Sequence, residues 1–132
     1  MAKSMKSGGG DRPSAQPRRL TKRSQLLYYL PIHEARSGER LGVLGDLSPE
    51  GLLIVGERKW DPGHRFKVQV KPGNATELLG DVELNADIEI RWAAQDANPS
   101  LYLSGALFQN LSPEQEEVIQ QMLHRLGLLH QQ

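Results

Sequence analysis

The sequence predicts an all-β fold: a six-stranded antiparallel β-barrel, split or closed, with a C-terminal α-helix and a disordered N-terminal arm. Three observations lead to this prediction. Short apolar segments with alternating or β-branched residues recur between residues 26 and 108. Turn signals containing Gly, Pro, Asn or Asp separate these segments about every 8–12 residues. After Ser112, the apolar spacing becomes that of an amphipathic helix.

The beginning of the chain differs in composition from the rest. Residues 1–16 are rich in Gly, Ser, Lys and Pro and have almost no large apolar side chain. They cannot bury enough surface to offset the entropy of ordering, so we expect a disordered basic tail. One domain is predicted over residues 17–127, with the barrel at about 24–108 and the helix at about 113–126.

The charges are divided unevenly along the chain. Residues 1–23 hold seven basic groups against one acidic group, for a net charge of +6. The remaining residues hold nine basic against fifteen acidic groups, for a net charge of −6. A basic arm on an acidic body indicates either an anionic ligand that the arm reaches or a solvated tail that loosely contacts its own body.

The first four strands are expected at 26–33, 41–45, 52–55 and 66–70. Pro31 cannot donate to a strand ladder, which implies an edge position or a bulge in the first strand. A hairpin loop is expected at 34–40 around Ser37 and Gly38. Further turns are expected at 61–63 and 71–74, where Pro and Gly occur together.

The next segment, 78–92, resembles one long strand that a bulge can interrupt. Its apolar residues fall on alternate positions: Val82, Leu84, Ala86, Ile88, Ile90 and Trp92. After a loop at 96–99, the last strand is expected at 101–108.

The C-terminal helix has a well-marked beginning. Ser112 can cap it, Pro113 suits the first helical position, and Gln115 completes a capping box. One apolar stripe follows, made of Val118, Ile119, Met122, Leu123 and Leu126. We expect this stripe to pack on an opening or a flank of the barrel, with Gly127 ending the helix.

Several classes of function are excluded or disfavoured. The chain has no cysteine, so it forms no disulfide, thiolate metal site or cysteine nucleophile. The four histidines show no metal-ligand spacing, and no nucleophile–base pair is evident, so we expect no metal, no cofactor and no enzymatic activity. No apolar run approaches the roughly 18 residues of a membrane span, and no secretory signal is evident. A cytoplasmic location without membrane insertion is therefore expected.

Two polar clusters remain to be explained: the basic segment 18–23 and the segment 46–51 between the second and third strands. An arginine guanidinium binds a phosphate or the O6/N7 edge of guanine through two parallel hydrogen bonds. In the second cluster, Asp46 can accept from the guanine N1–H and amino groups, Ser48 can donate or accept, and Gly51 permits close backbone approach. A ligand with phosphates and guanine edges would satisfy both clusters.

The two clusters resemble the motifs of the PilZ domain family. Arg19 and Arg23 match its RxxxR element, and Asp46, Ser48 and Gly51 match its [D/N]xSxxG element at the expected separation. The last strand, with the sequence Gly-Ala-Leu-Phe at 105–108, is also similar, and the resemblance covers roughly residues 17–127.

The resemblance implies a receptor for the bacterial second messenger cyclic di-GMP, active in motility or biofilm regulation. The arginines of RxxxR would bind phosphates and guanine edges, and the [D/N]xSxxG residues would hold a guanine and the phosphodiester. Arg18 stands where family members that bind an intercalated ligand dimer carry a further arginine. The predicted ligand-binding residues are Arg18, Arg19, Arg23, Asp46, Ser48, Gly51 and Trp92.

Other interpretations remain open at this point. The arginines can belong to a solvated linker, and segment 46–51 can be a turn capped by its own side chains. Trp92 can stack on a guanine, or it can belong to the barrel core or rim. The protein partner in trans is not identified by the sequence, and a ligand-independent PilZ-like adaptor is the alternative function. A nucleic-acid partner is not expected, because the body is acidic and aromatics make up only 5% of the chain.

Overall fold

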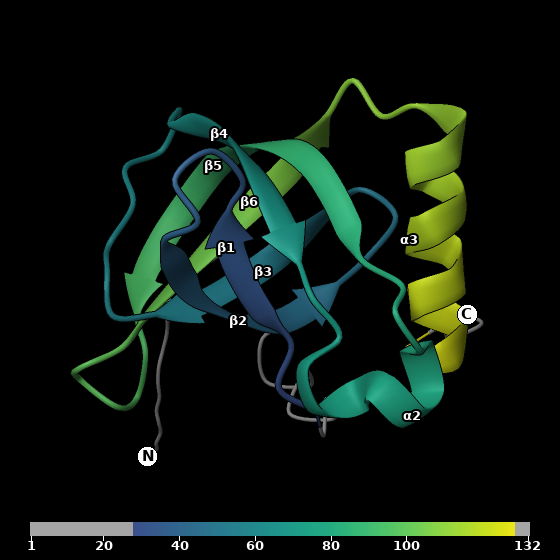
Figure 1. The fold of residues 1–132 in the computed structure, drawn as a ribbon. Coiled ribbons are helices and arrows are strands. Elements are labelled where there is room, and N and C mark those ends of the chain that lie inside the picture. Colours follow the sequence, from purple (N-terminus) through teal and green to yellow (C-terminus); the bar gives the residue numbers. More distant parts are fainter. Residues whose placement is uncertain (1–27, 129–132) are drawn as a thin grey trace, which may run out of the picture.

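The computed structural model describes residues 28–128, which form a closed six-stranded barrel with a helix on its flank (Figure 1). The strands are β1 (Pro31–Glu34), β2 (Arg40–Leu47), β3 (Gly51–Gly56), β4 (Arg65–Val70), β5 (Leu84–Gln95) and β6 (Tyr102–Gln109). They close in the order β1-β2-β3-β6-β5-β4, and all neighbours are antiparallel. The predicted barrel with a C-terminal helix is confirmed. The predicted tail, 1–16, lies outside the described residues.

The barrel interior is filled by the apolar side chains that alternate along each strand. Ile32, Val68, Val70, Leu84, Ala86, Ile88 and Ile90 have no exposed surface. Full burial of a valine, leucine or isoleucine side chain contributes about 1.5–3 kcal/mol. The even spacing of these residues in the sequence therefore corresponds to one continuous core.

The helix α3 (Pro113–Arg125) begins as the sequence predicts. The Gln115 backbone N–H donates to Ser112 Oγ (3.1 Å), and the Ser112 backbone N–H donates to Gln115 Oε1 (2.7 Å). Gln115 Nε2 also donates to the carbonyl oxygen of Asn85 (2.7 Å), which fixes the helix start to β5. The stripe packs inward through Ile119, Met122 and Leu123, so α3 covers a flank of the barrel (Figure 1).

The segment before β5 differs from the prediction. Residues 73–79 form a 3₁₀ turn, η2 (Gly73–Ala75), and a short helix, α2 (Thr76–Leu79), so the prediction of a strand from residue 78 is wrong. Gly80, with φ of 63°, follows the helix in a conformation that favours glycine. Leu79 is fully buried, so this helical turn covers part of the core beside α3. The strand then runs from 84 to 95, longer at its end than expected.

Pro31 fits the ladder without an edge strand. It is the first residue of β1, and the register of β1 against β2 shifts between Ile32 and His33. A proline at the first position of a strand removes no interior ladder bond. Of the two predicted explanations, the structure shows a register shift one residue after Pro31, within a barrel that has no edge strand.

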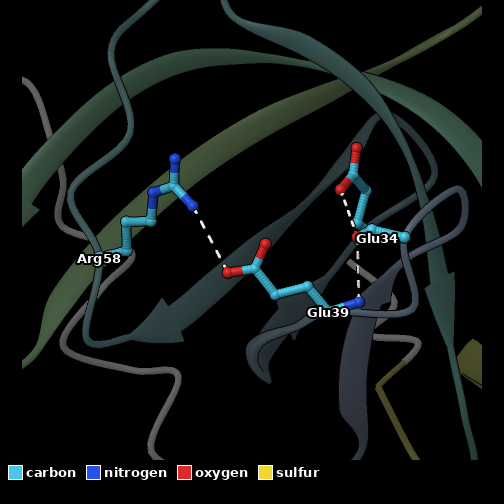
Figure 2. A network of polar contacts seen from close by, with 4 residues as sticks. Glu34, Glu39 and Arg58 are labelled. Carbon is cyan, nitrogen blue, oxygen red and sulfur yellow. Dashed lines mark hydrogen bonds and ion pairs between the residues drawn. The ribbon is translucent and has the colours of Figure 1, made fainter.

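A small polar network connects the loop between β1 and β2 with Arg58 (Figure 2), next to the buried Trp60. The Arg58 guanidinium lies 4.1 Å from the Trp60 ring centre and 3.5 Å from Glu39 Oε2. The Glu34 backbone N–H donates to the carbonyl oxygen of Glu39 (2.8 Å), which tightens the loop between β1 and β2. These contacts join that loop to the segment after β3 above the buried indole.

Candidate functional site

Two β-bulges determine which side chains face out of the barrel. In β2, Leu44 pairs with Ile54 and Asp46 pairs with Leu53, so Gly45 is an extra residue. Simple alternation would place Asp46 on the same side as Leu44, which is buried in the core. The extra residue reverses the alternation, so Asp46 faces outward while Leu47 is buried.

A second bulge has the same effect in β5. Ile90 pairs with Ala106 and Trp92 pairs with Gly105, which leaves Arg91 as the extra residue. Ile90 points into the core and is fully buried. Trp92 faces outward, with its indole over Gly105, so the alternating pattern that grouped it with Ile90 is wrong at this position.

Register brings the two outward residues into one row across four strands. Asp46 pairs with Leu53, Leu53 with Gly105, and Gly105 with Trp92. Directly paired residues of antiparallel strands share a face. With neighbouring strands about 4.8 Å apart, the row is about 14 Å long.

A parallel row beside it is entirely apolar. Val43 pairs with Val55, Val55 with Leu103, and Leu103 with Ala94. We call the two rows together the outer platform, made of Val43, Asp46, Leu53, Val55, Trp92, Ala94, Leu103 and Gly105. The platform faces out of the barrel, with a carboxylate at one end and an indole at the other, and its central residues Leu53 and Leu103 are largely buried.

Two glycines allow side chains of the outer platform to lie close to the sheet backbone. A Cβ at Gly45 would stand 2.7 Å from a methyl group of Val55 and 3.0 Å from one of Leu53. A Cβ at Gly105 would collide with the indole of Trp92. Glycine at these two strand positions therefore lets Leu53 and Trp92 lie against the sheet.

The turn between β2 and β3 borders the outer platform. The Gly51 backbone N–H donates to Ser48 Oγ (3.2 Å), and the Ser48 backbone N–H donates to the carbonyl oxygen of Gly51 (2.9 Å). A side chain at Gly51 would collide with the carbonyl oxygen of Ala106 on β6. Ser48 and Gly51 thus shape the turn, as the capped-turn interpretation predicts. The Leu47 backbone N–H donates to Asp46 Oδ1 (2.9 Å).

The structure brings together some of the predicted site residues. Asp46 and Trp92 lie at opposite ends of one row, and Ser48 and Gly51 form the adjoining turn. Arg18, Arg19 and Arg23 lie outside the described residues, so their approach to the outer platform stays a prediction. The sequence interpretation missed Leu53, Leu103 and Gly105. Glycines inside apolar strands are the signal that points to such a surface.

His33, which lies away from the outer platform, has a shifted pKa. Burial lowers the pKa of His33 below its usual value, and the nearby charges of Lys71 and Arg40 lower it further. Its Nδ1 atom is buried without a hydrogen-bond partner. The neutral imidazole is therefore the favoured form of His33 near neutral pH.

The fold and this surface define a small β-barrel domain whose distinctive face lies on the outside of the sheet. Residues 17–125 match the model of the PilZ domain family. The chain therefore belongs to the PilZ domain family, which confirms the resemblance of its motifs.

Solved structures show the same fold. The chain is 20% identical to the PilZ domain with c-di-GMP of YcgR from Escherichia coli (TM-score 0.58), covering 76% of this chain and 82% of that one. It is 10% identical to the inhibitor of motility MotI/DgrA from Bacillus subtilis (TM-score 0.60), covering 78% of this chain and 48% of that one. It is 15% identical to MrkH of K. pneumonia in its apo state (TM-score 0.58), covering 76% and 47%.

The chain thus spans about half the length of the last two proteins. At these identities the likeness concerns the fold. A comparison with curated proteins gave no match. Among residues 28–128, no helix is long and apolar enough to span a membrane.

Proposed function

We propose that this chain is a receptor domain for cyclic di-GMP, which binds on the outer platform and draws the arginine-rich N-terminal arm, residues 1–25, over the barrel. The observation that carries the proposal is the row from Asp46 to Trp92 on the outside of a PilZ barrel. The similar structure of the YcgR domain is described with c-di-GMP, which supports the choice of ligand.

The platform offers groups that complement a guanine nucleotide. The Asp46 carboxylate can accept from guanine N1–H and the amino group, which are donors. The Trp92 indole presents a flat face on which a base can stack. Leu53 lies between Asp46 and the indole, which covers Gly105, so Leu53 and the ring form the apolar part of this row.

Charge explains why the arm is part of this site. Residues 28–128 hold nine basic and fifteen acidic groups, a net charge of −6, which repels a ligand with two phosphates. The arm contributes the guanidinium groups of Arg18, Arg19 and Arg23, which pair with phosphates and guanine edges. The basic arm therefore supplies the positive charge that the acidic body lacks, so we expect the anion to bind between the two.

The proposed output is a change of surface. When the ligand orders the arm, the surface that the barrel presents to a protein partner in trans changes. Such coupling suits a cytoplasmic regulator of motility, exopolysaccharide or biofilm formation, acting by binding and without a cofactor or an enzymatic step.

The test is calorimetric titration of the full chain with cyclic di-GMP, with GMP as the control ligand. We expect a dissociation constant in the micromolar range or tighter, and loss of binding in both Arg23→Ala and Asp46→Ala. Two ligands per chain would agree with an intercalated dimer held by Arg18, and one per chain would remove the dimer.

Two outcomes would reject parts of the proposal. If neither substitution weakens binding, the assigned site is wrong. If saturating cyclic di-GMP leaves the melting temperature unchanged and calorimetry shows no heat, a ligand-independent adaptor becomes the better description, since any ligand of the native state raises stability by mass action.

A further inference from the structure

We propose that Arg91 is a further ligand-binding residue, which reads the guanine base that stacks on Trp92. This inference rests on the proposed function. Its basis is the bulge in β5, where Ile90 pairs with Ala106 and Trp92 with Gly105, while Arg91 is the residue between them. Such bulges redirect side chains and are common beside binding sites.

The direction of the Arg91 side chain follows from its neighbours. Ile90 is fully buried in the core, so the side chain of the next residue points away from the core. Arg91 is exposed, and Trp92 lies on the same outer face above Gly105. The bulge therefore presents a guanidinium and an indole consecutively at one end of the outer platform.

The charges around Arg91 set it apart from the cations of β4, Arg65 and Lys67. Before the bulge, Asp87 and Glu89 of β5 pair with Lys67 (3.8 Å) and Arg65 (3.1 Å) of β4. Beyond Arg65 these cross-strand pairs end, because Ile90 is bonded instead to the backbone of Gly63 and His64.

On the side of β5 away from β4, Arg91 lies next to β6. The residues of β6 at this level are Gly105 and Ala106, which carry no charge. Arg91 therefore lies between the paired charges of β4 and β5 and the apolar outer platform. From this position its side chain can contact a ligand on the platform rather than a residue of a neighbouring strand.

The chemistry of the pair favours guanine. A guanidinium donates two parallel hydrogen bonds to guanine O6 and N7, while adenine offers an acceptor and a donor at the same edge. A base held flat on Trp92 has its edges in the plane of the ring, within reach of the long side chain of the preceding residue. Arg91 then discriminates cyclic di-GMP from cyclic di-AMP at this end of the platform.

The experiment measures dissociation constants for both dinucleotides in the full chain. Four proteins are compared: the unmodified chain, Arg91→Ala, Arg91→Lys and Arg36→Ala. Arg36 is an exposed arginine in the loop between β1 and β2, so its removal makes the same change of charge away from the platform.

We expect Arg91→Ala to weaken cyclic di-GMP binding about tenfold, the range of one bidentate contact to a base, and to change cyclic di-AMP binding little. Arg91→Lys keeps the charge but not the fork of donors, so it should recover only part of the affinity. Arg36→Ala should remain within about twofold of the unmodified chain, because Arg36 is an exposed loop charge that salt screens.

The results distinguish this inference from the function on which it rests. An unmodified chain that binds no cyclic di-GMP rejects the proposed function and this inference with it. If that chain binds but Arg91→Ala behaves as Arg36→Ala does, Arg91 makes no contact and only the inference is wrong. Equal losses for both dinucleotides also overturn it, because the guanine edge is then not what Arg91 reads. Unchanged melting temperatures of the free variants would confirm that the fold is intact.

Discussion

The outside of this barrel has two faces of opposite character, and β5 belongs to both. Over its first half, the outward residues of β5 are Asp87 and Glu89, which pair with Lys67 and Arg65 of β4. Over its second half, they are Trp92 and Ala94, which lie beside β6 in the outer platform. The change occurs at one residue, Arg91, where the strand is bulged.

The difference shows that one extra residue in each of two strands is enough to create a distinct outer surface on a packed barrel. The charged face keeps strict alternation, so its outward positions meet water and one another. The platform face has an extra residue in β2 and another in β5, and these turn Asp46 and Trp92 outward. The core beneath both faces is the same continuous set of apolar side chains.

The strongest way to break this contrast is to delete Glu89 from the regular half of β5. Arg91 would then take the place of Ile90 opposite Ala106, inside a core that is already filled, or the register of β5 would shift. We expect a loss of about 3 kcal/mol in the free energy of unfolding, measured by urea denaturation. Deletion of Arg91, the extra residue, is the matched control: Ile90 stays opposite Ala106 and Trp92 stays opposite Gly105, so this variant should unfold nearly as the unmodified chain does. Equal stability of the two variants would show that Arg91 is not the extra residue of the strand.

Replacing Trp92 with alanine tests the platform face without altering the ladder. The indole is half-buried on the outer surface, so its loss removes a stacking partner for a base. We expect cyclic di-GMP affinity to fall by about 1–3 kcal/mol, or roughly 5- to 150-fold, in calorimetry. Lys67→Ala, on the charged face, should leave affinity nearly unchanged. A comparable loss in both variants would mean that the two faces do not differ in binding.

The substitution Gly105→Ala tests whether the position of the Trp92 indole matters for ligand binding. In Gly105→Ala the new Cβ meets the Trp92 indole, which has to move away from the sheet. We expect affinity for cyclic di-GMP to fall about tenfold, because the tilted ring no longer lies parallel to the base. A shift in tryptophan fluorescence without ligand would report the displaced ring. If fluorescence shifts and affinity does not, the position of Trp92 is irrelevant to binding.

Much of this architecture could be predicted from the sequence because its signals are local. The capping box at Ser112 and Gln115 fixes the start of α3, and alternating apolar residues identify most strands. The spacing of Asp46, Ser48 and Gly51 identified the family and one end of the platform.

The remaining features depend on contacts between distant segments. A bulge adds one residue without changing composition, so the sequence allowed a bulge in this strand but did not place it between Ile90 and Trp92. Leu78 and Leu79 suit a strand equally well by composition, but they lie in α2, where Leu79 reaches the core. Register then unites Asp46 with Trp92 through Leu53 and Gly105, and no local signal encodes that pairing.

The smallest expected effect concerns the charged face itself. Lys67 and Asp87 are each about half exposed, with their charged atoms 3.8 Å apart. An exposed pair of this kind contributes about 0.2–1 kcal/mol and is screened by salt. A double-mutant cycle of Lys67→Ala and Asp87→Ala at low salt should therefore give a coupling energy in that range, and one near zero in 1 M salt. A larger coupling energy that persists in 1 M salt would show that more than solvent-exposed ion pairs stabilises this face. The two faces would then differ in ligand binding but not in how they are stabilised.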